Sequence, residues 1–160
     1  SADVDIPESG ASGVITAMGG SIGGWSLYAL DGKLKFCYNF FGIDHYFTES
    51  EAPIPTGHHQ VRMEFAYDGG GIAKGGDVTL YVDGSQVGSG RVAQTQPMGF
   101  SADETLDVGV ENASPVSPDY GPRGNRFTGT VNWVQMDVGK DDHDHLITPD
   151  ERFKIAMAQQ

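Results

Sequence analysis

The chain holds one cysteine, Cys37, and a cysteine thiolate is a strong nucleophile. Cys37 lies in the run "KFCYNFF", which covers residues 35–41. Successive residues of a strand face opposite sides of a sheet, and every second residue around Cys37 is apolar: Leu34, Phe36, Tyr38 and Phe40. We therefore expect Cys37 to face away from the core, beside Lys33 and Lys35. Lysine ammonium groups would lower the pKa of an outward-facing thiol.

A catalytic thiol also needs a base and an oriented partner, and the sequence supplies neither at a fixed spacing from Cys37. The metalloprotease pattern H-E-x-x-H and the phosphate-binding P-loop pattern do not occur in the chain. The E-x-D-x-x-E strand of concanavalin A-like glycosidases does not occur either. We interpret Cys37 as an unreactive strand residue.

Carboxylates gather in the segment 100–121, where Asp103, Asp107 and Asp119 lie in or beside loops. Calcium is held by oxygen ligands of this kind, so these three residues are candidates for a metal site. The competing interpretation is an acidic loop that is simply solvated. A second acidic run, "DDHDH", carries His143 and His145, and the same two interpretations apply to it.

The sequence makes nucleic acid and membranes poor partners for this chain. The chain has 160 residues, with 22 acidic and 10 basic side chains and a formal net charge of −12. Such a surface repels phosphate backbones and anionic headgroups, so nucleic acid is a poor partner. No stretch reaches the roughly 20 apolar residues of a membrane span.

Short apolar runs between turn residues predict an all-β fold. The expected strands cover 2–6, 13–18, 25–30, 33–40, 44–48, 59–67, 77–82, 85–92, 104–109 and 127–138. Asp31-Gly32 and Asp83-Gly84 predict two hairpins with type I′ turns. Alternating apolar residues indicate a two-sheet antiparallel sandwich, with a core that includes Val61, Met63, Phe65, Leu80, Val134 and Met136.

The sandwich is expected to cover residues 1–139, followed by an acidic linker and a short helix over 140–160. Thr148, Pro149 and Glu151 form a helix-capping pattern. Phe153, Ala156 and Met157 then lie on one side of that helix. A helix of this length is marginal on its own in water, so we expect it to pack on the sandwich or on a partner.

Three stretches resemble the C-terminal region of bacterial arylsulfatases. They are "GGWSLYALDGKLKFCYNFFGI", "VRMEFAYDGGGIAKGGDVTLYVDGSQVGSGR", and the segment from "FSADETLDVG" to "NRFTGTVNWVQMDVG". The "LYVDG" hairpin is also similar to concanavalin A-like and laminin G-like jelly-roll sandwiches. The resemblance implies a sandwich that accompanies a catalytic domain, with further sequence before Ser1 that includes one more strand.

The catalytic residues of sulfatases cannot be transferred to this chain. Sulfatases convert the first residue of C/S-x-P-x-R into formylglycine, whereas Cys37 is followed by Tyr38, Asn39, Phe40 and Phe41. The resemblance therefore implies a non-catalytic accessory domain whose partner is a sulfatase catalytic domain.

Three functions remain as hypotheses: an accessory domain, a carbohydrate-binding module and a self-sufficient small enzyme. We expect Trp133 to share an outward face with Val131 and to act as an interface anchor or a sugar-stacking platform. Phe153 and Met157 would extend the interface, and a second copy of the chain could take the partner's place. The acidic charge favours the interface over a sulfated glycan, unless calcium bridges the two.

Overall fold

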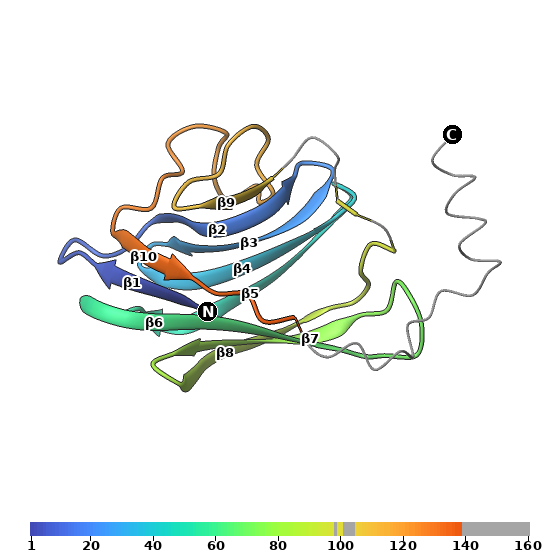
Figure 1. The fold of residues 1–160 in the computed structure, drawn as a ribbon, viewed down its shortest axis with the longest axis horizontal. Coiled ribbons are helices and arrows are strands. Elements are labelled where there is room, and N and C mark those ends of the chain that lie inside the picture. The colour runs from blue at the N-terminus through green and yellow to red at the C-terminus, as the bar shows by residue number, and fades with distance from the viewer. Residues whose placement is uncertain (98, 101–104, 139–160) are drawn as a thin grey trace.

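The structure, a computed structural model, describes residues 1–97, 99, 100 and 105–138. It contains two five-stranded antiparallel sheets that pack face to face, as Figure 1 shows. The prediction of a two-sheet antiparallel sandwich is therefore confirmed. The helix expected within 140–160 lies outside the described residues. No helix in the described ranges is long and apolar enough to cross a membrane.

The first sheet has the strand order β10-β1-β6-β7-β8. Its strands are β10 (Thr130–Val134), β1 (Ala2–Ile6), β6 (Gly57–Tyr67), β7 (Gly76–Val82) and β8 (Ser85–Val92). The second sheet has the order β5-β4-β3-β2-β9. Its strands are β5 (Asp44–Pro53), β4 (Lys33–Phe40), β3 (Gly23–Leu30), β2 (Gly13–Gly20) and β9 (Leu106–Val108).

Both predicted Asp-Gly hairpins are present. Asp31 and Gly32 have φ values of 52° and 80°, and they join β3 to β4. Asp83 and Gly84 have φ values of 49° and 79°, and they join β7 to β8. Positive φ at both central residues is the type I′ geometry, whose twist matches that of the flanking strands.

The core lies between the two sheets and is built from alternate residues of their strands. Val4 of β1, Leu34 of β4, Val61 of β6 and Leu80 of β7 are fully buried in it. The sandwich is closed along one edge, where β5 lies against β8. At the opposite edge the two sheets end in β9 and β10.

The predicted core was correct where β1, β6 and β7 pair with one another and wrong for the two residues that lie past the end of β1. Val61 and Leu80 are buried, and Met63 and Val134 are half-buried against the core cluster. Two further predicted core side chains remain exposed, Phe65 by 37% and Met136 by 45%. Both side chains lie on the inner face of the sheet, as predicted. They remain exposed because β1 pairs with β6 only as far as Val61 and does not cover them.

The difference in burial between Leu80 and Phe65 predicts that truncating them lowers the free energy of unfolding by unequal amounts. Leu80→Ala should lower the free energy of unfolding by about 2–5 kcal/mol, because it empties a fully buried position. Phe65→Ala should cost only about 1–2 kcal/mol, because much of that ring is already in water. Urea unfolding of both variants measures the two values. A larger loss for Phe65→Ala would contradict the observed burial.

Candidate functional site

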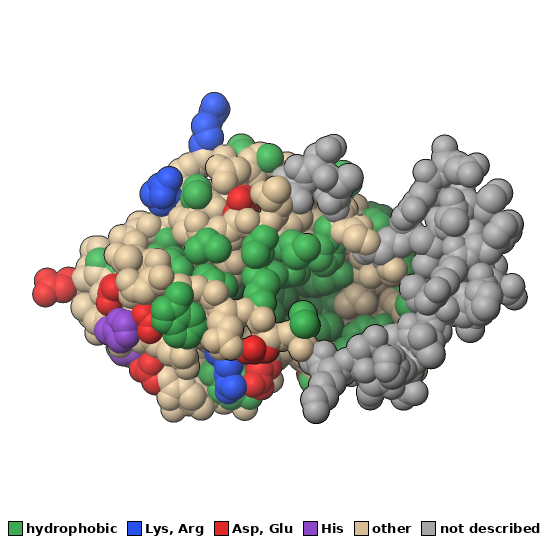
Figure 2. Space-filling view, in the orientation of Figure 1, with side chains coloured by type: hydrophobic (Ala, Val, Ile, Leu, Met, Phe, Trp, Pro, Cys, Tyr) green, Lys and Arg blue, Asp and Glu red, His purple; other side chains and the backbone are tan. Residues whose placement is uncertain are grey.

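An apolar cleft opens between the sheets beside the N-terminus. Its volume is about 770 Å³, and Figure 2 shows it as a hollow with hydrophobic side chains across the middle of this face. One wall comes from the second sheet, through Met18 of β2 and Trp25 and Leu27 of β3. The other comes from the first sheet and the segment after β10, and includes Met63, Phe65, Val134, Met136 and Val138.

The charged groups of the cleft lie at its rim and largely neutralise one another. Arg62 and Glu64 form an ion pair at 2.8 Å, and the Asp137 carboxylate, which accepts a hydrogen bond from Gln135 at 2.9 Å, attracts the N-terminal ammonium of Ser1. Among the residues that line the cleft, those from the facing strands β2 and β3 carry no charge. The cleft therefore suits an apolar surface rather than a charged small molecule.

The structure separates Trp133 from Val131, which were predicted to share a face. A bulge in the pairing of β1 with β10 sets Asp3 opposite Trp133 and Val4 opposite Val131. This irregularity leaves Trp133 41% exposed, while Val131 packs against the core cluster. The prediction of an outward Trp133 is confirmed and that of an outward Val131 is wrong. Phe153 and Met157 lie outside the described residues.

A polar cluster lies beside Trp133 on the outer face of the first sheet. The His58 ring is 3.1 Å from the Asp3 carboxylate and 3.0 Å from that of Asp5. Asn132 donates to both carboxylates at 2.9 Å. The hydrogen bond with Asp5 and the charge of Asp3 raise the pKa of His58. An exposed indole among hydrogen-bonding side chains is an arrangement that can stack on a sugar ring.

Cys37 is fully buried, although it does lie on the sheet face opposite the main core. It packs in a second cluster with Val14, Ala17 and Tyr28, against Tyr120 of the loop over residues 109–127. The expected lowering of its pKa is wrong, because burial raises the pKa of the thiol to about 12. The alternation of residues in a strand cannot reveal that a loop covers Cys37, since the loop comes from some 80 residues later in the chain.

The same loop is fixed to the sheet by Asp119. Its carboxylate accepts hydrogen bonds from Lys35 Nζ and Tyr28 Oη, both at 2.6 Å. Partial burial opposes ionisation, but the bonds from Lys35 and Tyr28 outweigh it and lower the pKa of Asp119. The structure thus uses this carboxylate to hold the loop over the second cluster.

The structure describes two of the three calcium candidates, Asp107 and Asp119, and each is bonded to other groups of the protein. Asp119 is paired with Lys35, and the Asp107 carboxylate accepts from the backbone and side chain of Asn112 at 2.6 and 3.2 Å. Asp103 lies outside the described residues. Within the part of the chain that the structure describes, no three His, Cys, Asp or Glu side chains are arranged to hold a metal ion.

One serine motif was not among the predicted sites. Residues 19–23 read Gly-Gly-Ser-Ile-Gly and match the hydrolase pattern G-x-S-x-G. That pattern implies a nucleophile only where a strand turns sharply into a helix. Here Ser21 is an exposed residue of the turn between β2 and β3, and its amide is hydrogen-bonded to Ser114. This antiparallel hairpin does not provide the geometry of a nucleophile elbow.

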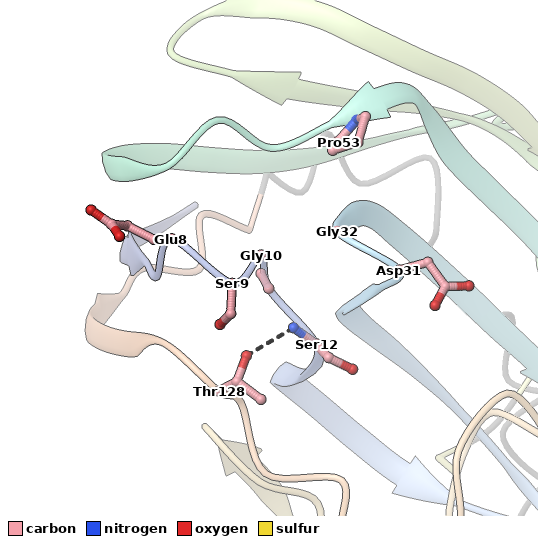
Figure 3. A pocket seen from close by; sticks show the side chains of 9 residues that line it. Glu8, Ser9, Gly10, Ser12, Asp31, Gly32, Pro53 and Thr128 are labelled. Carbon is pink, nitrogen blue, oxygen red and sulfur yellow. Dashed lines mark hydrogen bonds between the residues drawn. The ribbon is translucent and has the colours of Figure 1, made fainter.

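A second hollow, shown in Figure 3, lies between the 8–12 segment and the β3–β4 turn. Its volume is about 560 Å³. A hydrogen bond of 3.0 Å from the Ser12 amide to Thr128 crosses it, and its two carboxylates, Glu8 and Asp31, lie on opposite sides. Its charged groups do not converge, so the apolar cleft is the better candidate for a functional site.

No family model matches the chain, and no curated protein sequence matches it.

The burial of Cys37 predicts a thiol that reacts only after unfolding. With a pKa of about 12, its thiolate fraction at pH 8 should be on the order of a thousandfold below that of a free cysteine. Labelling with a disulfide reagent should therefore be very slow in the native protein and fast in guanidinium chloride. Rapid native labelling would show that the loop over residues 109–127 does not cover the thiol.

The Asp119 contacts predict a pH-dependent contribution to stability. Asp119→Asn should lower the free energy of unfolding at pH 7 by about 1–3 kcal/mol, because it weakens bonds to Lys35 and Tyr28. The folded pKa is depressed, so this stabilisation is present above the unfolded pKa and is lost as the pH falls through the folded value. The difference between wild type and variant should therefore shrink below about pH 4.

Urea unfolding between pH 7 and pH 2.5 measures this difference, and Asp44→Asn, at an exposed residue of β5, is the control. A gap between wild type and Asp119→Asn that stays constant down to the lowest pH would contradict the assigned ion pair.

Proposed function

We propose that this chain is a non-catalytic accessory domain that packs against a larger catalytic domain. The resemblance to the C-terminal region of bacterial arylsulfatases indicates that this partner is a sulfatase catalytic domain. The finer fold assignment, a jelly roll of the concanavalin A and laminin G kind, belongs to the same proposal. So does the packing of residues 140–160 on the sandwich or on the partner.

The single observation that carries the proposal is the apolar cleft between the sheets. Phe65, Met18 and Met136 are large hydrophobic side chains that line it and remain exposed. Large contiguous apolar surfaces are rare on monomeric proteins and are typical of interaction sites. The methionines of the cleft are flexible and polarisable, which suits a surface that must adapt to a partner.

The environment of Cys37 also favours a non-catalytic role. Its thiol is buried under the loop over residues 109–127, and its pKa is raised rather than lowered. A nucleophilic cysteine needs the opposite environment, namely a partly exposed and electropositive one. Asp119, a carboxylate bonded to this cluster through Tyr28, also accepts a hydrogen bond from Lys35.

A second candidate function is carbohydrate binding at Trp133. The specific observation in its favour is the exposed indole beside Asp3, Asp5, Asn132 and His58. These polar groups are bonded to one another, so a sugar would have to compete for them. The proposed interface needs no such exchange, and we rank it first.

Hydrogen exchange with and without a sulfatase catalytic domain tests the proposal. We expect slower exchange over residues 62–66 and 131–136, because the bound domain would cover the cleft and couple opening to dissociation. The C-terminal residues 150–158 are to be followed in the same experiment.

Two phenylalanines of similar exposure supply a test variant and its matched control. Phe65→Ser lies in the cleft and should abolish the protection, whereas Phe47→Ser, on the outer face of the other sheet, should leave it intact. Phe47 is 42% exposed against 37% for Phe65, so the two variants remove similar exposed apolar surface. If neither segment gains protection, the accessory-domain proposal fails. Quenching of Trp133 fluorescence by a glycan would then favour the sugar-binding role.

A further inference from the structure

We propose that His58 is a pH-sensitive latch, whose protonated ring fixes the bulge of β10 that turns Trp133 toward solvent. The latch lies on the outer face of the first sheet and depends neither on the cleft nor on the identity of a partner. It is built from four side chains on three adjacent strands, namely Asp3 and Asp5 of β1, His58 of β6 and Asn132 of β10.

The bulge places two consecutive residues of β10 on the outer face. Asp3 lies opposite Trp133 and Val4 lies opposite Val131, so Asn132 is the extra residue of β10. Such a bulge redirects side chains, and it allows Trp133 to face outward while Val131 packs against the core cluster. The contacts that hold Asn132 therefore also hold the direction of the indole.

Asn132 is held through both carboxylates of β1. Its side-chain amide donates to Asp3 Oδ1 and to Asp5 Oδ2, both at 2.9 Å. The His58 ring takes the other two oxygens, with Nε2 3.1 Å from Asp3 Oδ2 and Nδ1 3.0 Å from Asp5 Oδ1. Each of the four carboxylate oxygens thus has a partner, and Figure 2 shows histidine and acidic side chains gathered at the left of the molecule.

This pattern requires a charged imidazole. An ionised carboxylate only accepts hydrogen bonds, so both ring nitrogens of His58 must carry protons. A neutral ring has one N–H, and its other nitrogen would turn a lone pair toward a carboxylate. Loss of the proton therefore breaks one of the two bonds and removes the positive charge that offsets the repulsion between Asp3 and Asp5. Asn132 is then left bound to two carboxylates that repel each other.

The same contacts set the direction of the switch. The hydrogen bond with Asp5 and the charge of Asp3 raise the pKa of His58. The latch is therefore complete below the ordinary histidine pKa of about 6.5, and it opens as the pH rises through the higher folded value. A ligand that contacts the Trp133 indole would meet a bulge whose order depends on pH.

The other charged groups around His58 are engaged elsewhere. Arg62, further along β6, is paired with Glu64. Asp83, in the turn between β7 and β8, has its pKa lowered first by its bond with His59 and least by the charge of His58. All five residues of β10 are uncharged. Asp3 and Asp5 are therefore the groups that control the His58 ring.

An NMR titration between pH 5 and pH 9 tests the latch. The His58 ring should titrate with a midpoint above about 6.5. The backbone amides of Asn132 and Trp133 should titrate with the same midpoint. Their protection factors, which correct for the intrinsic pH dependence of amide exchange, should fall by at least about fivefold above that midpoint.

Two neighbouring histidines supply a test variant and its matched control. His58→Gln should leave the Asn132 and Trp133 amides without a titration in this range. His59→Gln removes a ring that is bonded to Asp83 and to the Thr56 carbonyl, and it should leave the titration at Trp133 unchanged. A titration that persists in His58→Gln, or one that disappears in His59→Gln, would overturn the latch.

Asn132→Ala separates the latch from a direct effect of the ring's charge. The pKa of His58 should stay raised, because both carboxylates remain, whereas the Trp133 amide should lose most of its response. An unchanged response of Trp133 in this variant would mean that the amide senses the charge alone, and the latch would be wrong. A Trp133 amide that does not follow His58 in the wild-type protein would equally contradict it.

Discussion

The close approach of β5 and β8 is the constraint on which the shape of this domain depends. A Cβ at Gly88 would overlap the carbonyl oxygen of Glu49, and one at Gly90 would overlap the Thr48 hydroxyl. Only glycine fits there, so these two residues of β8 let the two sheets meet along that edge. The edge strands on the other side, β9 and β10, have no such contact, and the cleft with its exposed Phe65 and Met136 lies on that side.

The two sheets therefore have different surroundings. The loop over residues 109–127 covers the part of the second sheet's outer face that contains Cys37, and Asp119 holds this loop through Lys35 and Tyr28. The first sheet carries its polar cluster and Trp133 on the outside and shares the apolar cleft on the inside. The cleft is the surface that would gain most from a partner, because covering apolar side chains removes them from water.

The sequence predicted what depends on local rules. The Asp31-Gly32 and Asp83-Gly84 turns and the alternation in β4 and β6 are set by neighbouring residues, and the structure contains them. It could not predict what depends on distant segments. The burial of Cys37 depends on a loop far along the chain, the direction of Val131 on a bulge, and the exposure of Phe65 on where β1 begins.

Photo-crosslinking from the cleft tests the central claim, that the cleft holds a protein partner, most directly. A photoreactive phenylalanine analogue would replace Phe65 in one protein and Phe47 in another, so that both probes stand at partly exposed aromatic positions. With a sulfatase catalytic domain present, the account predicts an adduct from position 65 and none from position 47. An adduct from position 47 alone, or none from either position, would contradict it.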